Sequence, residues 1–272
     1  MKSLQGKTLF ITGASRGIGL AIAKKAALDG ANIVIAAKSI TAHATLPGTI
    51  YSAANEIQAL GGKALALQVD IRDEQQITAA VTEAVKTFGG IDICINNASA
   101  ISLTDTADTT MKRFDLMHQV NTRGTYAVSQ ACLPHLLKAD NPHILNLSPP
   151  LNMQPKWFKN HGAYSIAKYG MSLCVLGMAA EYADRGVAVN ALWPKTVIYT
   201  AALAALGSLV DKDNCRTVQI VADSAYCILT RDAGDCSGNF FIDEEVLRHA
   251  GVSDFDQYAV VAGKELMADL FL

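Results

Sequence analysis

The chain has 272 residues, half of them hydrophobic, and its 23 basic and 25 acidic side chains leave a net charge of −2. This length and apolar content suit one α/β domain with a large core, and the balanced charge does not indicate a nucleic acid or an anionic membrane as partner. No apolar stretch approaches the roughly 20 residues of a membrane span. The six cysteines have neither C-x-x-C nor metal-ligand spacing, so we expect free thiols in a reducing cytoplasm and no metal site.

Short apolar runs alternate with longer segments of helical periodicity along the chain. The runs lack polar alternation, which predicts parallel strands covered on both faces and joined by right-handed helical crossovers. We therefore expect residues 1–272 to form one α/β domain, a single Rossmann-type, doubly wound parallel sheet with helices on both faces. In chain order the main predicted elements are a strand at 7–12, a helix at 17–30, a strand at 31–38, a helix at 49–62, a strand at 63–70, a helix at 73–90, a strand at 91–99, a helix at 109–137, a strand at 143–148, a helix at 162–186, and strands at 187–194 and 238–243.

A glycine-rich stretch, ITGASRGIG, follows the first predicted strand and opens the first predicted helix. Gly13, Gly17 and Gly19 allow a tight turn and a close approach to a pyrophosphate, and the helix N-terminus offers free N–H groups. An ordinary glycine-containing turn is the alternative, but the strand–turn–helix context favours a dinucleotide site. The candidate contacts in this turn are Gly13, Ser15, Arg16, Gly17, Ile18 and Gly19.

The end of the second predicted strand indicates which dinucleotide binds. NAD-binding proteins usually carry an acidic residue there for the ribose 2′-hydroxyl, whereas this chain has Ala36 and Ala37 followed by Lys38. Together, Arg16 and Lys38 place two cations and no anion where a 2′-phosphate would lie. Both could instead be ordinary surface charges. The pattern predicts NADP(H) in preference to NAD(H).

A tyrosine and a lysine stand four residues apart in AYSIAKYG, inside a predicted helix. Residues at i and i+4 share a helix face, so Tyr164 and Lys168 should point the same way. A nearby ammonium favours the phenolate, which would make Tyr164 a general acid for ketone reduction or a base for alcohol oxidation. A Y-x-x-x-K pair also occurs by chance, and it becomes specific only together with the glycine turn and the motifs between them.

Those motifs include NNAS at 96–99 and Asn121 in NTRG, and their order and spacing resemble the short-chain dehydrogenase/reductase family over nearly the whole chain. The resemblance implies that Tyr164 donates or accepts the proton and that Lys168 holds the nicotinamide ribose and lowers the pKa of the tyrosine. It implies that Asn121 holds a water linked to Lys168, and that the protein forms homodimers or homotetramers. The further cofactor contacts that it implies are Asp70, Ile71, Asn97, Ala98, Pro194, Thr196 and Val197.

Two positions depart from the family's pattern. Family members often have two serines at the end of the strand before the tyrosine, and the second hydrogen-bonds the substrate oxygen. Here Ser148 aligns with the first serine and Pro149 with the second. Proline has no side-chain donor, so either Ser148 takes the role beside Tyr164, as we expect, or the site lacks that hydroxyl. In addition, Lys195 replaces the glycine that usually follows the proline of the nicotinamide loop.

The segments GTIYSAANEI, RDEQQI and NALWPKT resemble one branch of the family, in which a dehydrogenase domain precedes a sterol-carrier domain. The chain would match the first domain, as a stand-alone relative or as a piece of a longer protein. We expect an NADP(H)-dependent oxidoreductase that interconverts a carbonyl and a hydroxyl group on a small or lipid-like substrate. The alternatives are a nucleotide-binding module without turnover and a non-redox lyase or epimerase. Trp157 and Phe158, in the loop before Tyr164, could contact the substrate or pack at the loop base.

Overall fold

The computed structural model describes residues 2–43, 46–204 and 210–272. Within these ranges seven strands form one sheet in which every neighbouring pair is parallel. The strand order β3-β2-β1-β4-β5-β6-β7 reverses direction at β1, which confirms the predicted doubly wound fold. The strands are β1 (Thr8–Thr12), β2 (Asn32–Ala37), β3 (Lys63–Gln68), β4 (Ile93–Asn96), β5 (His143–Asn146), β6 (Ala188–Trp193) and β7 (Phe240–Ile242).

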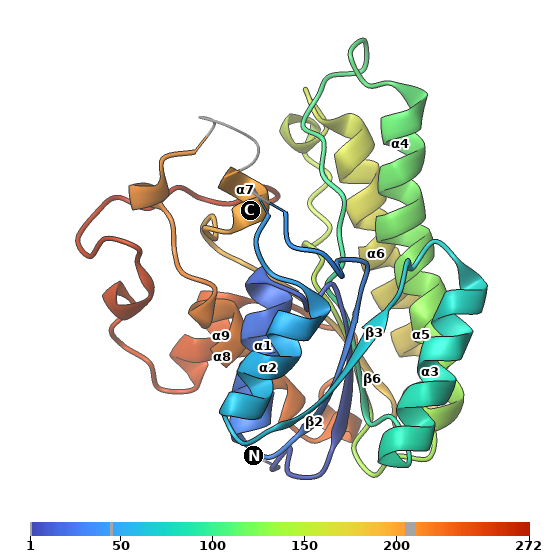
Figure 1. Cartoon of the computed structure of the whole chain (residues 1–272). Coiled ribbons are helices and arrows are strands. Elements are labelled where there is room, and N and C mark those ends of the chain that lie inside the picture. The colour runs from blue at the N-terminus through green and yellow to red at the C-terminus, as the bar shows by residue number, and fades with distance from the viewer. Residues whose placement is uncertain (1, 44–45, 205–209) are drawn as a thin grey trace.

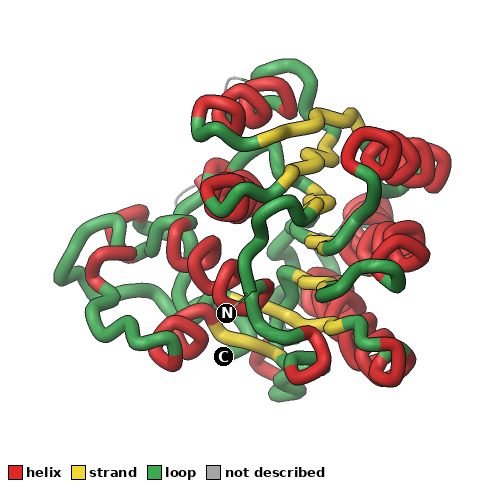
Figure 2. The backbone as a smooth tube through the Cα atoms, turned by 90° about the horizontal axis from the view of Figure 1, so that it is seen from below, coloured by secondary structure: helices red, strands yellow, loops and turns green. Residues whose placement is uncertain are grey.

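Helices cover both faces of the sheet, and Figures 1 and 2 show the strands as a twisted row between two helical layers. Side chains of β1 explain the apolar strand pattern, because Leu9 and Ile11 pack into one layer while Phe10 packs into the other. The first layer contains α1 (Gly17–Leu28), α2 (Ile50–Ala59), α8 (Gln219–Leu229) and α9 (Asp243–His249), and the second contains α3 (Glu74–Phe88), α5 (Gly124–Leu136) and α6 (Gly162–Glu181).

The helix predicted at 109–137 is continuous but not uniform. It begins as α4 (Met111–Met117), passes through a π-helical turn, η1 (His118–Arg123), and continues as α5. The backbone N–H of Gly124 donates to the carbonyl oxygen of Gln119, five residues earlier, as in a π-helix. The periodicity of the sequence did not predict this turn, which contains Asn121.

The last part of the chain returns to the loop that follows β6. Ala259 pairs with Arg216, and Ala268 pairs with Thr196, both in antiparallel bridges. A short helix, α7 (Ala201–Ala204), lies in the same loop region. Residues far apart in the sequence are thus brought to the carboxyl edge of the sheet, where the predicted site lies.

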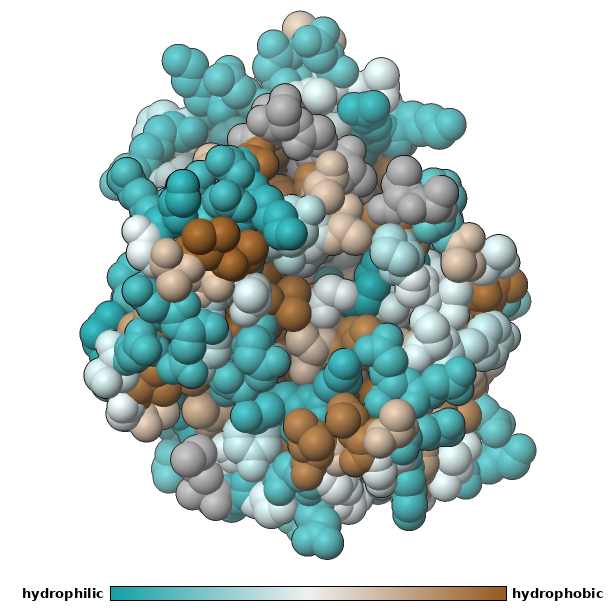
Figure 3. Space-filling model, turned by 60° about the vertical axis from the view of Figure 1, so that its left-hand side comes forward, coloured by the Kyte–Doolittle hydropathy of each residue, from teal (hydrophilic) through white to brown (hydrophobic). Residues whose placement is uncertain are grey.

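The surface is mixed in character. On the face shown in Figure 3, apolar side chains form small separate groups among hydrophilic ones. Large apolar side chains are exposed on α6, at Ile166, Leu173 and Leu176. No helix in the described part of the chain is long and apolar enough to cross a lipid bilayer. The six cysteines are all free thiols, as the sequence predicted.

Candidate active site

The glycine turn joins the end of β1 to the start of α1. The φ angles of Gly13 and Gly17 are 68° and 59°, in the left-handed region that glycine adopts without strain. The turn is also crowded, because a Cβ on Gly13 would lie 2.9 Å from Ala98 Cα and one on Gly19 would lie 2.5 Å from Asn97 Nδ2. Glycine is therefore required here by backbone conformation and by packing.

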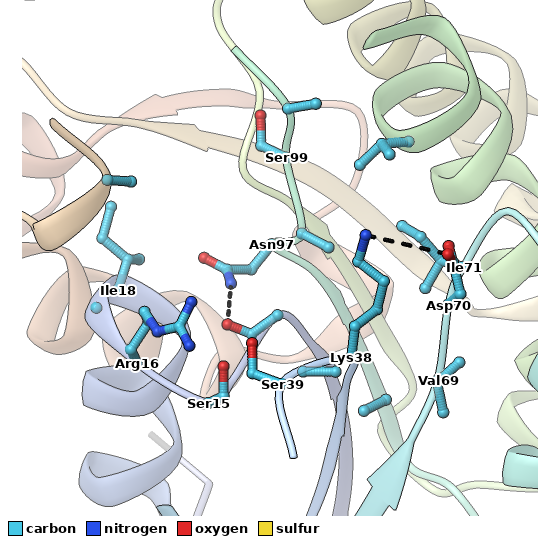
Figure 4. A pocket seen from close by; sticks show the side chains of 18 of the residues that line it. Ser15, Arg16, Ile18, Lys38, Ser39, Val69, Asp70, Ile71, Asn97 and Ser99 are labelled. Atoms are coloured by element: carbon cyan, nitrogen blue, oxygen red, sulfur yellow. Dashed lines mark hydrogen bonds and ion pairs between the residues drawn. The ribbon is translucent and has the colours of Figure 1, made fainter. Parts of the chain in front are cut away.

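Asn97, just after β4, holds the turn in place. Its Nδ2 donates to the carbonyl oxygens of Thr12 and Gly13, at 2.9 and 3.2 Å. Thr12 Oγ1 accepts from the backbone N–H groups of Asn97 and Ala98, at 3.0 and 3.1 Å. The side chain of Asn97 therefore joins the ends of β1 and β4 and forms part of the wall of the cleft beside them (Figure 4).

A cleft of about 390 Å³ opens beside the glycine turn, a size typical of small-molecule sites. Figure 4 shows side chains from the turn, from the end of β2 and from the segment after β3 lining it. Among the lining residues that were not predicted as contacts, Ser99 ends the NNAS motif, while Ser39 and Thr200 lie outside any motif with a recognisable spacing. The predicted cofactor contacts that line the cleft are Gly13, Ser15, Arg16, Gly17, Ile18, Lys38, Asp70, Ile71, Asn97 and Ala98.

The two predicted phosphate-binding cations both line this cleft, Arg16 from the glycine turn and Lys38 from the end of β2 (Figure 4). Arg16 donates through Nε and Nη2 to the carbonyl oxygens of Pro47 and Gly48, at 2.9 and 2.6 Å, so its guanidinium is anchored to the loop after β2. Lys38 Nζ lies 4.0 Å from Asp70 Oδ2 and its side chain is 59% exposed. A hydrogen bond from Arg72 holds the pKa of Asp70 below its usual range.

Tyr164 and Lys168 lie one turn apart near the start of α6. Lys168 Nζ donates to the carbonyl oxygen of Leu147 at 2.8 Å and lies 5.1 Å from the centroid of the Trp193 ring. Tyr164 and Lys168 are only 5% and 4% exposed, and neither lines the cleft. Burial raises the pKa of Tyr164 and lowers the pKa of Lys168 to about 7. Burial and the charge of Asp269 thus oppose the phenolate, and the lowering of the Tyr164 pKa by Lys168 stays a prediction.

Ser148 is fully buried two residues after the end of β5. Its Oγ has no hydrogen-bond partner in the described part of the chain, so it does not bond to the Tyr164 hydroxyl in this structure. Pro149 contributes only its carbonyl oxygen, which accepts from Ser172 Oγ at 2.6 Å. The catalytic role of Ser148 stays a prediction, and Pro149 supplies no side-chain donor in its place.

Asn121 is fully buried in the π-helical turn η1. Its Nδ2 donates to the carbonyl oxygen of Ala100 at 2.9 Å, and its Oδ1 accepts from the backbone N–H of Ala100 at 2.7 Å. The side chain thus fixes the loop that leaves β4. Irregular helical turns of this kind are frequent at functional sites, and the predicted water contact of Asn121 stays a prediction.

The loop after β6 contains the predicted nicotinamide contacts Pro194, Thr196 and Val197, all of them buried. Lys195, the departure from the family's glycine, points to the acidic start of α9. Its backbone N–H donates to Asp243 Oδ1 at 2.9 Å and its Nζ to Glu244 Oε1 at 2.7 Å. The lysine therefore anchors this loop to α9.

Residues 267–271, here called the closing segment, lie over this loop. The Val197 N–H donates to the Met267 carbonyl oxygen at 2.9 Å, and the Asp269 N–H donates to the Lys195 carbonyl oxygen at 3.1 Å. Phe271 is fully buried in a cluster with Tyr164. Burial also raises the pKa of Asp269 to about 7, and its carboxyl interacts with the charge of Lys168. No sequence motif pointed to this segment, which is more than a hundred residues from Tyr164.

The sheet order and the strand–turn–helix arrangement of the glycine turn are those of a dinucleotide-binding α/β fold. A sequence model of the short chain dehydrogenase family matches residues 7–208, so the chain belongs to that family.

The more specific resemblance to one branch of the family is also confirmed. The chain is 64% identical over 270 residues to hydroxysteroid dehydrogenase-like protein 2 of Xenopus tropicalis, a match that covers 99% of this chain and 64% of the relative's length. A solved putative dehydrogenase from Xanthomonas campestris is 59% identical, with a TM-score of 0.96 and 99% of both chains covered. A metagenomic short-chain oxidoreductase solved in complex with NADP is 25% identical, with a TM-score of 0.73, and the match covers 89% of this chain and 98% of that one.

Proposed function

We propose that the chain is an NADP(H)-dependent oxidoreductase that interconverts a carbonyl and a hydroxyl group on a small or lipid-like substrate. The observation that carries the proposal is the placement of Tyr164 and Lys168 on one face of α6, in a fold whose neighbouring cleft bears Arg16 and Lys38. The similar oxidoreductase that holds NADP supports this choice of cofactor.

The residues of the cleft fit a dinucleotide. The glycine turn leaves no room for a Cβ at Gly13 or Gly19, and the start of α1 offers backbone N–H groups to a pyrophosphate. Arg16 and Lys38 would bind a ribose 2′-phosphate, while Asp70 stands where the family resemblance puts the adenine. The bound nicotinamide would supply or accept the hydride.

Side chains of the protein itself transfer the proton. In the reductive direction Tyr164 gives its proton to the substrate oxygen, and in the oxidative direction the phenolate takes it back. The ammonium of Lys168, on the same helix face, stabilises the phenolate. The surrounding ring cluster excludes water, which strengthens this attraction.

Replacing Tyr164 with phenylalanine tests the proposal, because the change removes only the hydroxyl. Turnover of a panel of ketones, followed by NADPH absorbance, should fall at least about a hundredfold. NADPH affinity, measured by calorimetry, should stay the same. A Tyr164→Phe variant with full activity on a good substrate would contradict the mechanism.

A nucleotide-binding module with little turnover is the second candidate. Two observations favour it: Pro149 stands where the family's second serine aligns, and Tyr164 is almost fully covered. The same assay separates the two candidates. The module would bind NADPH tightly but would oxidise it with no member of the ketone panel.

We also propose that the protein is a homodimer or homotetramer in the cytoplasm. The exposed apolar side chains Ile166, Leu173 and Leu176 of α6, together with Tyr126 of α5, offer a surface for a second copy. The free thiols, four of them buried, suit a reducing compartment.

A further inference from the structure

The closing segment packs directly against Tyr164. Phe271 is 0% exposed, and its ring centroid lies 6.3 Å from that of Tyr164. Tyr164, the residue that would transfer the proton, is itself only 5% exposed. The other rings around Phe271 are Tyr169, Trp193, Trp157 and His161, at centroid distances of 5.2, 5.8, 6.0 and 6.4 Å.

Phe271 is the principal anchor of the closing segment. It is fully buried, whereas residues 267–270 are exposed or half-buried. The segment is also held by hydrogen bonds to its backbone, such as the one from Trp193 Nε1 to the Leu270 carbonyl oxygen at 2.9 Å, and by the buried carboxyl of Asp269, which interacts with the charge of Lys168. Water can replace such bonds at modest cost, while withdrawal of a phenyl ring exposes a large apolar area. A ligand that fills the ring-lined space would offset that cost.

The closing segment also uses a donor that a cofactor would need. The Val197 N–H donates to the Met267 carbonyl oxygen at 2.9 Å. The family resemblance assigns the loop from Pro194 to Val197 to the nicotinamide amide. The same N–H cannot serve both partners at full strength, so cofactor binding should loosen the segment at this point.

We propose that Phe271 is an internal ligand of the substrate pocket, and that the closing segment leaves the pocket when an uncharged substrate with a flat apolar ring enters. This proposal rests on the function proposed for Tyr164 and adds a substrate class to it. Contacts between ring faces and ring edges favour another flat ring in this space. A charged group would lose its hydration there, at a high cost in free energy.

The first test measures binding without turnover. A bicyclic ketone, α-tetralone, is titrated by calorimetry into protein saturated with NADP⁺, which cannot reduce a ketone. The unaltered protein must first displace its own phenyl ring, so Phe271→Ala should bind α-tetralone at least about tenfold more tightly. Leu272→Ala, which removes a neighbouring but exposed side chain, is the matched control and should bind like the unaltered protein.

Equal or weaker binding by Phe271→Ala would show that Phe271 is a fixed wall of the pocket, and would overturn the proposal. Failure of α-tetralone to bind any of the three proteins would overturn the ligand class. Because no step of catalysis is measured, these outcomes do not depend on the Tyr164→Phe result, which tests the proposed function separately.

A second measurement uses only the unaltered protein, in case the variant does not fold. Hydrogen exchange at the amides of Met267 and Asp269, which donate to the carbonyl oxygens of Asn214 and Lys195, should accelerate at least about tenfold with NADP⁺ and α-tetralone bound. Amides of β1, far from the segment, serve as the internal control. Unchanged protection of both amides in the saturated complex would overturn the proposal.

Discussion

Replacing Lys38 with alanine should weaken NADP⁺ binding while leaving NAD⁺ binding almost unchanged. Lys38 lines the cleft, and its Nζ makes one weak contact, 4.0 Å from Asp70 Oδ2. Asp70 would keep its closer partner, Arg72, whose Nη2 lies 2.5 Å from Oδ2. The change should therefore remove one positive charge from the cleft without disturbing the residues around it.

The expected magnitude follows from the exposure of the side chain. A charge-assisted hydrogen bond contributes roughly 1.5–3 kcal/mol. Lys38 is 59% exposed, so solvent and salt screen its charge and place the contact at the low end of that range. A loss of about 1.4 kcal/mol corresponds to about tenfold weaker NADP⁺ binding. NAD⁺ has no 2′-phosphate, and its affinity should change by less than about twofold.

The assay is calorimetric titration of both nucleotides into the unaltered protein, Lys38→Ala and Lys86→Ala. Lys86 lies on α3 with its side chain 75% exposed and does not line the cleft, so it controls for net charge. The difference between Lys38→Ala and the unaltered protein should shrink as salt is raised. Equal affinity of the unaltered protein for NADP⁺ and NAD⁺, or an equal loss for both in Lys38→Ala, would refute the reasoning.

Three further predictions concern the proton, the serine and the assembly. Burial lowers the pKa of Lys168 to about 7, so its positive charge is lost as pH rises through 7. The value of kcat/KM for ketone reduction should therefore decline above pH 7. A flat profile up to pH 9 would contradict this prediction. Ser148→Ala should lower kcat about a hundredfold with cofactor affinity unchanged if its hydroxyl contacts the substrate, as we expect, and unchanged kcat would show that the serine only ends a strand. Leu173→Glu places a charge in the exposed apolar surface of α6 and should yield the 28.9 kDa monomer in light scattering. The unaltered protein should instead have the mass of a dimer or tetramer. A monomeric unaltered protein would refute the proposed assembly.

The strands, the glycine turn and the shared helix face of the candidate site could be predicted from the sequence. Apolar runs without polar alternation predict strands covered on both sides, and the glycine spacing predicts a strand–turn–helix cradle, because both patterns depend on neighbours in the chain. The same holds for Tyr164 and Lys168, whose common helix face follows from helical geometry alone. The fold class and the family were predicted correctly from such local patterns.

The contacts between distant segments were decided only by the tertiary structure. Asn97 bonds the glycine turn from just beyond the end of β4, and Asn121 holds the loop after β4 from within a π-helical turn. Above all, packing brings Phe271 against Tyr164 and bonds Met267 to Val197. These contacts could not be predicted from the sequence, because periodicity indicates which face of a helix or strand is buried but not which distant residue packs against it.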